Sequence, residues 1–252
     1  MDVDRISCSE ASELIGDWAA LHSSRMVLAA NVHMTMEAVD DQAFRNIMNE
    51  ADLVVPDGNP LVWALKARGF ADARHVRGQD LVLAVCETAE ERLLRVGMYG
   101  TTEEVLEAAK RNLLRRFPRL NIVFSHAPPF RNLSLQEDRQ VIDAINRSEA
   151  QILLVATGCP KQEKWMAAHL SGLSAVMIGA GAAIDMIGEQ QPVAPRWMQS
   201  SGLEWVFRLA SDPARLWRRY AKHNLRFVAL VVIEIATAAS RTGRSRFSGT
   251  GG

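Results

Sequence analysis

Short apolar runs alternate with helical stretches along most of this chain, and this alternation restricts the folds that the chain can adopt. Six runs have the composition of β-strands: Met26–Ala30, Asp52–Val55, Leu94–Tyr99, Asn121–Ser125, Gln151–Ala156 and Ala175–Ile178. A turn or a helical stretch follows each of them. Strands that alternate with helices in this way are typical of α/β proteins with a parallel sheet. We therefore predict a mainly parallel, doubly wound sheet flanked by helices.

Local signals predict where several of the helices begin. Thr101 and Ser134 each precede a glutamate by three residues, which is the spacing of a capping box. Pro60 and Pro160 are each expected to be the first residue of a helix, because proline has a fixed φ and lacks the N–H that would be unpaired there. Between the first two strands, Met36–Asn49 is expected to form one helix.

The composition indicates a globular protein without a global charge bias. The 252 residues are 48% hydrophobic, which allows either one α/β domain with an appendage or two domains. The 29 basic residues balance the 29 acidic ones, so net charge predicts no nucleic-acid partner. Cys8, Cys86 and Cys159 are widely spaced, which argues against a disulfide framework or a zinc site and fits a reducing cytoplasm.

The chain also lacks the signals of export and membrane insertion. Its first ten residues contain no basic region followed by an apolar region, and no run of 18 apolar residues occurs. We therefore expect a cytoplasmic protein that does not span a membrane.

The segment Thr157–Met166 is the first candidate for a binding site. It follows a predicted strand, contains small residues in a turn, and leads into a predicted helix. In open parallel sheets ligands bind at the carboxyl ends of strands, and helix N-termini offer N–H groups to anions. The segment is therefore either a phosphate-binding turn or an ordinary connection between a strand and a helix.

Three polar residues follow the first two strands and are expected at the same edge of the sheet. Asp57 precedes Gly58 at the end of the second strand, where its carboxylate could serve as a general base. An aspartate before glycine is also a common turn former. Asn31 and His33 follow the first strand, and His33 is interpreted as a polar loop residue.

Two further patterns are weaker. Gly179, Gly181 and Asp185 form a glycine-rich turn after the last strand, but the full dinucleotide pattern is absent and the turn comes late in the chain. A dinucleotide-binding fold is therefore only an alternative. Asp2-Val3-Asp4 has the spacing of a metal-binding motif, but it lies at a terminus that we expect to be frayed. No other metal cluster is expected, and no cofactor.

From Pro195 onward the chain is expected to form a helical appendage without strands. Between Arg196 and Arg246, ten basic residues face only three acidic ones, so this part is basic. On a helix, Arg208, Arg215 and Arg218 share a face that suits a diphosphate or anionic lipids, or that is simply solvated. Leu225–Ala239 is strongly apolar and must pack on protein or contact lipid headgroups.

Several ordered motifs together resemble one family, the WecG/TagA/CpsF family of bacterial glycosyltransferases. The resemblance covers roughly residues 25–227. Its motifs are PDGNPLVW at Pro56–Trp63, GQDL at Gly78–Leu81, PPFR at Pro128–Arg131, GCPKQEKWM from Gly158, GAGAAID from Gly179, and APRWMQSSGLEWVFRL from Ala194.

The resemblance implies a Rossmann-like fold and an inverting, metal-independent glycosyl transfer. The expected donor is a UDP-sugar, and the expected acceptor is a saccharide linked to polyprenyl diphosphate at the inner face of the cytoplasmic membrane. The pathway would be the synthesis of exopolysaccharide or of a cell-envelope polysaccharide. A homo-oligomer is left open.

The resemblance also implies roles for individual residues. Asp57 would be the base that activates the acceptor hydroxyl, and Gln162 would lie in the donor pocket. The other core residues expected to line the substrate site are Asn31, His75, Gly158, Gly179, Gly181 and Asp185. From the appendage, Arg208, Arg215 and Arg218 would close over the site and hold the diphosphate, which needs cations when no metal is present.

Two positions depart from the family pattern. Ala29 replaces the usual threonine two residues before Asn31, and His75 replaces the usual arginine. These changes suggest weaker donor binding, a different sugar, or a catalytically weakened homologue that binds nucleotide sugar as a partner or regulator. An NAD-type reductase is a third alternative. The predicted organisation is a catalytic core over residues 1–194, an appendage over 195–240 and a disordered tail over 241–252.

Overall fold

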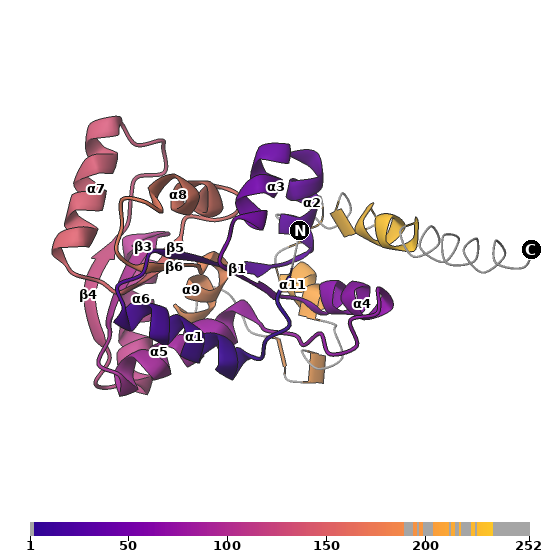
Figure 1. Ribbon diagram of the computed structural model, residues 1–252, viewed down its shortest axis with the longest axis horizontal. Helices are drawn as coiled ribbons and strands as arrows, with labels where there is room; N and C mark the ends of the chain where they lie inside the picture. Colours follow the sequence, from indigo (N-terminus) through magenta and orange to yellow (C-terminus); the bar gives the residue numbers. More distant parts are fainter. Residues whose placement is uncertain are drawn as a thin grey trace, which may run out of the picture.

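The centre of the protein is a sheet of six strands in the order β2-β1-β6-β5-β3-β4, and every pairing is parallel (Figure 1). The structure is a computed structural model that describes residues 3–188, 194–195, 197–198, 204–211, 213–214, 217, 223–224 and 226–233. The strands are β1 (Arg25–Ala30), β2 (Leu53–Pro56), β3 (Arg95–Gly100), β4 (Asn121–His126), β5 (Ile152–Ala156) and β6 (Val176–Gly179). The prediction of a parallel α/β fold is confirmed.

Helices cover both faces of the sheet, so the protein has three layers (Figure 1). One face is covered by α1 (Cys8–Ala20), α5 (Gly78–Glu91), α6 (Glu103–Arg116) and α9 (Gly181–Ile187). The other is covered by α2 (Val32–Asp40), α3 (Gln42–Asn49), α7 (Leu135–Arg147) and α8 (Lys161–His169). The remaining helix of the core, α4 (Asn59–Ala67), follows β2.

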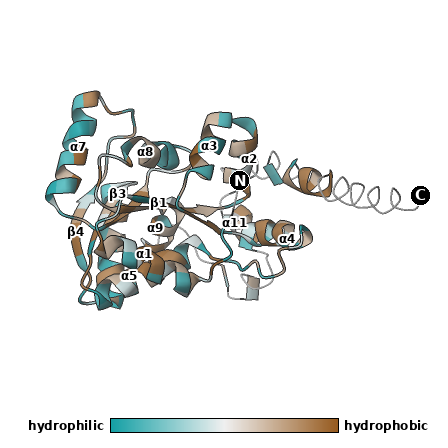
Figure 2. Ribbon diagram, in the orientation of Figure 1, coloured by the Kyte–Doolittle hydropathy of each residue, from teal (hydrophilic) through white to brown (hydrophobic). Residues whose placement is uncertain are grey.

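Five of the six strands are largely buried on both faces, which is why they read as continuous apolar runs in the sequence, whereas the edge strand β4 is only partly buried. In β1, Val27 packs into the cluster under α1 and α5, whereas Met26 and Leu28 pack into the cluster under α2 and α8. In β5, Leu154 packs into the cluster under α1 and α5, and Leu153 packs into the cluster under α2 and α8. Figure 2 shows hydrophobic strands at the centre and more hydrophilic residues on the outer helices. Burying one such side chain stabilises the fold by about 1.5–3 kcal/mol.

Of the four predicted helix starts, one is confirmed and three lie one residue away from their predicted positions. Pro60 is the second residue of α4, which begins at Asn59. The Ser134 and Glu137 capping box begins α7 as predicted. Thr102, not Thr101, caps α6 by accepting a hydrogen bond from Val105 N, because Thr101 has a φ of 46° and lies outside the helix. Pro160 is the N-cap of α8 and not its first helical residue.

The predicted helix over Met36–Asn49 is two helices. The break is at Asp41, whose extended backbone ends α2 and whose carboxylate accepts hydrogen bonds from Ala43 N and Phe44 N at the start of α3. Aspartate favours such caps over helix interiors, because its side chain competes for backbone N–H groups.

The N-terminal segment is better ordered than the sequence suggested. Asp4 was expected to lie in a frayed end, but its carboxylate accepts a hydrogen bond from Val54 N, and its own N–H donates to Val54 O. Two hydrogen bonds therefore attach Asp4 to the edge strand β2. Helix α1 follows, and its start at Ser7 and Glu10 is a complete capping box that the sequence analysis did not use.

The described part of the expected appendage is helical. It contains α11 (Glu204–Ser211) and a helical segment at residues 226–233. The side chain of Arg208, together with Arg215, Arg218 and the predicted tail, lies outside the described residues. The predicted domain boundaries remain predictions. Within the ranges given above, none of the helices combines the length and hydropathy needed to span a bilayer.

Candidate functional site

A large cavity lies at the carboxyl edge of the sheet, between the core and the C-terminal segments. Its volume is about 1690 Å³. Parallel strands place their carboxyl ends at one edge, so residues that follow different strands meet there. All eight core residues that the sequence analysis assigned to the site line this cavity: Asn31, Asp57, His75, Gly158, Gln162, Gly179, Gly181 and Asp185.

Asp57 occupies one corner of the cavity directly after β2. Its N–H donates to Ala30 O at 2.7 Å, which ties the start of this turn to the end of β1. Its side chain is 26% exposed, and Oδ1 lies 3.7 Å from Nε2 of His75. A Cβ built on Gly78 would lie 3.5 Å from Cβ of Ala29 and 3.7 Å from Oδ2 of Asp57. Ala29 and His75, which depart from the family pattern, therefore both lie close to the candidate base Asp57.

Asn31 lies beside this corner and has a structural task. Its side-chain oxygen caps α2 by accepting a hydrogen bond from Met34 N at 3.1 Å. The cap orients the side chain at the cavity wall, and the amide nitrogen has no hydrogen-bond partner within the described part of the chain. His33 was interpreted as a loop residue but lies in the first turn of α2 and also lines the cavity.

Gln162 lines the cavity and is buried close to three glycines. The side chain accepts a hydrogen bond from Gly158 N at 3.2 Å and is 7% exposed. A Cβ on Gly179 would lie 3.0 Å from its Nε2, and a Cβ on Gly181 would lie 2.9 Å from its Oε1. These two glycines therefore make room for Gln162. The N–H of Gly158, which a phosphate-binding turn would offer to an anion, is already used.

Glu163 is buried next to Gln162 and receives a hydrogen bond from it. Gln162 Nε2 donates to Glu163 Oε1 at 2.7 Å, and Oε2 of the same carboxylate is buried without a hydrogen-bond partner among the described residues. Burial raises the pKa of Glu163 above its ordinary value, because a charged carboxylate is disfavoured away from water. Glu163 was not among the predicted site residues.

Asp185 lies in α9 and is linked to the end of β3. Thr101 Oγ1 donates to Asp185 Oδ1 at 3.3 Å, and Thr101 N donates to Ala156 O at 2.9 Å. Thr101 follows Gly100, where a Cβ would lie 2.3 Å from the backbone carbon of Ala156, so only glycine fits. The Thr101 hydroxyl was expected to cap α6, but it donates a hydrogen bond to Asp185, whose carboxylate was expected to bind substrate.

An aromatic group forms another part of the cavity wall. The rings of Tyr99 and Trp165 have centroids 4.6 Å apart, and Trp165 lies at the same centroid distance from His169. Asp138 connects this group to α7 by accepting hydrogen bonds from Trp165 Nε1 at 3.2 Å and interacting with His169 Nε2 at 2.8 Å. Burial raises the pKa of Tyr99 to about 12, so its hydroxyl is neutral at physiological pH.

This group was not predicted, because its members come from separate elements. Tyr99, Asp138 and Trp165 belong to β3, α7 and α8, and no local spacing joins them. The one available signal was Trp165 within the motif that starts at Gly158.

The described C-terminal segments close one side of the cavity. In α11, Glu204 Oε2 lies 3.2 Å from Arg77 Nε, and both side chains are largely buried. Further along, Phe227 is buried in the cluster that contains the α2 residues, and it lines the cavity. The arginines that were expected to close over the site cannot be placed, because Arg215, Arg218 and the side chain of Arg208 lie outside the described residues.

The arrangement suits the binding of a polar, anionic ligand next to a carboxylate. Helices α2, α4, α8 and α9 all begin at the cavity edge, so the positive ends of their dipoles lie near it. Lys161, in the first turn of α8, also lines the cavity and forms no ion pair with another described residue. A carboxylate, backbone dipoles and a cation are the groups needed to deprotonate a hydroxyl and stabilise a diphosphate.

The chain is similar to known bacterial glycosyltransferases over nearly its whole length. The model of the glycosyl transferase WecG/TagA/CpsF family matches residues 1–241. The N-acetylglucosaminyldiphosphoundecaprenol N-acetyl-beta-D-mannosaminyltransferase of Staphylococcus aureus strain MW2 is 27% identical over 249 residues, which is 98% of this chain and 94% of the relative. The protein of the same name from strain NCTC 8325 / PS 47 has the same identity and coverage.

Proposed function

Because this chain belongs to the WecG/TagA/CpsF family of glycosyltransferases, we propose that it transfers a sugar from a UDP-sugar to a saccharide linked to polyprenyl diphosphate. Membership of the family makes the chain a glycosyltransferase. The identities of its donor and its acceptor are what we propose. The observation that carries it is the position of Asp57, at the end of β2 in a cavity with Gln162 and Asp185. In exopolysaccharide or cell-envelope synthesis, the product would be a lengthened lipid-linked glycan.

The names of the relatives support the acceptor class. They describe transfer of an N-acetylmannosaminyl group to N-acetylglucosaminyldiphosphoundecaprenol, which is a saccharide on a lipid diphosphate. We propose the same acceptor class for this chain. An N-acetylhexosamine is the first donor sugar to test, and Ala29 and His75 mark the corner where a different sugar would be selected.

In the proposed reaction Asp57 is a general base in a single displacement. Its carboxylate takes the proton from the acceptor hydroxyl, and the acceptor oxygen attacks the anomeric carbon of the donor. The bond from that carbon to the diphosphate oxygen breaks as the new glycosidic bond forms, so UDP leaves and the configuration inverts. The carboxylate must lie within hydrogen-bond reach of the hydroxyl, which its place on the cavity wall allows.

The leaving diphosphate needs positive charge, and we propose that this chain supplies it without a metal at the reacting atoms. Lys161 and the dipoles of the helices that begin at the cavity edge lie in the core. Arg208, Arg215 and Arg218 would add guanidinium groups from the C-terminal segments, and guanidinium binds phosphate oxygens in a bidentate manner. Their part is proposed from the family resemblance alone.

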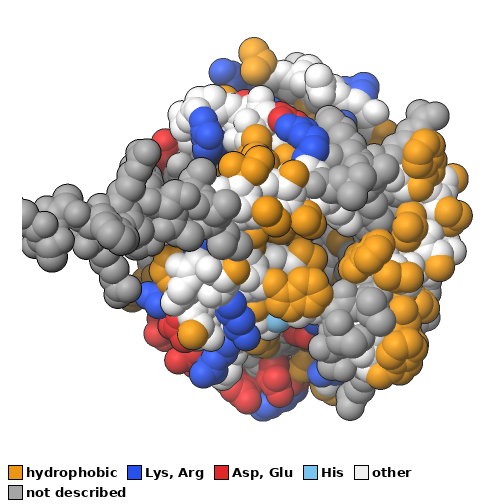
Figure 3. Space-filling view, turned by 90° about the vertical axis from the view of Figure 1, so that its right-hand side faces the viewer, with side chains coloured by type: hydrophobic (Ala, Val, Ile, Leu, Met, Phe, Trp, Pro, Cys, Tyr) orange, Lys and Arg blue, Asp and Glu red, His pale blue; other side chains and the backbone are white. Residues whose placement is uncertain are grey.

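A lipid-linked acceptor requires the enzyme to work at a membrane, and exposed apolar side chains support this location. Figure 3 looks at the end of the molecule that carries α4 and α11 and shows hydrophobic side chains gathered over that face. At residues 226–233, Val228, Val232 and Ile233 are each more than half exposed, as are Trp63 and Trp217. Apolar groups beside a basic segment suit an anionic membrane surface, so we propose peripheral binding at the inner face of the cytoplasmic membrane.

The reductase alternative has little support. The glycines that resembled a nucleotide turn, Gly179 and Gly181, face the side chain of Gln162. The weakened-homologue alternative has one observation in its favour, since His75 stands 3.7 Å from Asp57 where the family has arginine.

The proposal is tested by measuring UDP release from a panel of UDP-sugars, with and without an acceptor made of N-acetylglucosamine on a short polyprenyl diphosphate. We expect release from at least one donor, and only when the acceptor is present. Lack of acceptor-dependent release from every donor would contradict the proposal. The same assay with nicotinamide cofactors tests the reductase alternative, which predicts a change in absorbance of the nicotinamide.

A further inference from the structure

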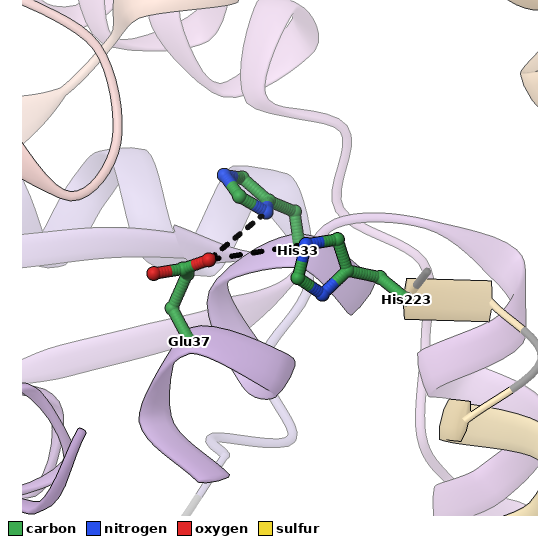
Figure 4. Close-up of side chains that lie close together, drawn as sticks. All are labelled: His33, Glu37 and His223. Atoms are coloured by element: carbon green, nitrogen blue, oxygen red, sulfur yellow. Dashed lines mark ion pairs between the residues drawn. The ribbon is translucent and has the colours of Figure 1, made fainter. Parts of the chain in front are cut away.

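Two histidines and a glutamate from distant parts of the chain meet beside the cavity. His33 and Glu37 lie one turn apart on α2, and His223 approaches them from the C-terminal segment (Figure 4). His33 Nδ1 is 3.8 Å and His223 Nε2 is 3.9 Å from Glu37 Oε1. One ligand atom from each residue lies within 4.8 Å of the other two. His223 is 4% exposed, so the group is well shielded from solvent on that side.

We propose that His33, Glu37 and His223 bind one Zn²⁺ ion that fastens the C-terminal segment to α2. Two imidazoles and one carboxylate are an established donor set for zinc, with one position left for water or another oxygen ligand. Both separations from Glu37 are longer than a hydrogen bond. Zinc bonds of about 2.0–2.1 Å at a tetrahedral angle would place the ligand atoms about 3.4 Å apart. Each histidine nitrogen would therefore move roughly 0.5 Å closer to Glu37 Oε1, and the two imidazoles, whose ligand atoms lie within 4.8 Å of each other, would also approach each other.

The α2 half of the site is held in place by its helix. Residues four apart on a helix face the same side, which brings the His33 and Glu37 side chains together. Asn31 caps this helix at the residue before Val32, so the first turn that carries His33 is fixed. Two of the three ligands are therefore in place before the C-terminal segment arrives.

The third ligand arrives on a segment that has its own contacts with α2. Arg226 forms two hydrogen bonds with the carboxylate of Asp40, at 2.9 and 2.6 Å. Phe227 is 6% exposed and packs in the cluster that also contains Met34, Met36 and Ala38 of α2. These contacts lie along the same helix as Glu37, so docking of the segment and closure of the metal site favour each other.

Docking of the C-terminal segment does not depend on the proposed glycosyl transfer. A docked segment forms one wall of the cavity, because His223, Asn224 and Phe227 line it. Zinc would hold this wall in place and would not take part in the chemical step. Metal binding and docking can each be measured without a substrate, so a failure of the transfer assay leaves this test intact.

The test uses the full-length protein, stripped with a chelator and then titrated with Zn²⁺ in competition with a chromophoric chelator. We expect one tight equivalent, and binding at least ~10-fold weaker in Glu37→Gln and in His223→Gln, since loss of even an outer partner of a metal ligand costs that much. Hydrogen exchange provides the second measurement. Zn²⁺ should slow the exchange of amides at residues 226–233 in the wild type and leave them unchanged in both variants.

His22→Asn is the matched control, because it removes an exposed imidazole that is remote from the site and keeps a residue that tolerates the positive φ of 51° at this position. It should bind Zn²⁺ as the wild type does. Co²⁺ supplies a check that is independent of affinity: its visible bands should appear in the wild type and be absent in His33→Gln. Equal Zn²⁺ affinity in wild type and His223→Gln, or no effect of Zn²⁺ on exchange at residues 226–233, would overturn the proposal.

Discussion

At the scale of single residues, the structure of the cavity wall depends on buried polar side chains. Gln162 is held by Gly158 N and by Glu163, and the two glycines of the neighbouring turn leave room for it. Glu163 is itself fully buried. Because Glu163 can ionise, the stability of this part of the fold depends on pH.

The first prediction concerns Glu163→Gln. Burial raises the pKa of Glu163 above its ordinary value of 4.5. Well below pH 4.5 the Glu163 carboxyl is protonated in both the folded and the unfolded chain, so its ionisation does not lower the free energy of unfolding. As pH rises above 4.5, the unfolded chain loses the proton first, and the stability of the wild type falls until the pH passes the folded-state pKa. Glutamine does not ionise. The variant should therefore gain stability relative to the wild type as pH rises, by at most about 1.4 kcal/mol per pH unit.

Urea unfolding of both proteins between about pH 2.5 and pH 8 measures this difference in the free energy of unfolding, because this range includes the acidic region where the contribution of Glu137 is lost. Glu137→Gln is a control of opposite sign. Arg131 and the Ser134 N–H lower the pKa of Glu137, so its contribution is present above pH 4.5 and is lost on acidification. The prediction would be contradicted if the free energies of unfolding of Glu163→Gln and the wild type differed by the same amount at every pH. Folding would then not change the pKa of Glu163.

The second prediction concerns His75, which stands beside the candidate base in place of an arginine. In His75→Arg, a permanent guanidinium next to the cavity should bind donor phosphate oxygens, and one charge-assisted hydrogen bond of about 1.5 kcal/mol lowers donor KM about tenfold. The value of kcat should not rise, because a cation near Asp57 makes that carboxylate a weaker base. Steady-state kinetics with varied donor measure both quantities. If donor KM is unchanged in His75→Arg and in His75→Gln, this position does not contact the donor.

At the scale of secondary-structure elements, the C-terminal segments are attached to the core by a few specific contacts. The pair formed by Arg77 and Glu204 holds α11, and its side chains are only 13% and 16% exposed. Removing one partner from a largely buried pair leaves the other charge without compensation.

The third prediction is that Glu204→Gln loosens α11 while the core stays intact. A loss of about 3 kcal/mol corresponds to roughly 100-fold faster hydrogen exchange in α11. Exchange in α1 and α5 should not change. Asp80→Asn is the matched control, because Asp80 contacts the same arginine at 3.5 Å from an exposed position. Equal protection of α11 in wild type and Glu204→Gln would mean that other contacts hold this helix.

The elements themselves were largely predictable, and the errors have local causes. All six β-strands were predicted, and strands such as β1 and β5 were predictable because burial on both faces makes each of them an apolar run. The break at Asp41 and the shift from Thr101 to Thr102 were missed, because capping by a side chain depends on backbone geometry that spacing does not reveal. Helix α1 was missed although the Ser7 and Glu10 capping box was visible in the sequence.

At the scale of the whole molecule, the strand pattern predicted the site residues that follow strands, whereas His75 and Gln162 were expected from the family resemblance; both of these also line the cavity. Parallel strands bring their carboxyl ends together, so Asn31, Asp57 and Gly179 were expected at one edge, and all three line the cavity. The group of Tyr99 and Trp165 and the meeting of Glu37 with His223 depend on how separate elements pack. No spacing within one element encodes such contacts.

The fourth prediction treats the C-terminal segments as a cover that the reaction requires. Removal of the chain from Pro195 onward should abolish transfer while the α/β core keeps its circular dichroism spectrum. The melting temperature should fall, because Phe227 no longer covers its cluster, which contributes about 1.5–3 kcal/mol. Full activity in the shortened protein, measured as UDP release, would show that the core alone binds and activates both substrates.

We propose that Asp57 removes the proton from the acceptor hydroxyl. The most direct measurement is kcat for Asp57→Asn in the UDP-release assay, with the surface variant Asp72→Asn as the control, because Asp72 pairs with Arg5 in an exposed position. A general base contributes about 100-fold to 10,000-fold, so kcat should fall by at least ~100-fold in Asp57→Asn, with little change in donor KM. Asp72→Asn should match the wild type. An unchanged kcat in Asp57→Asn would contradict the assignment of Asp57 as the base.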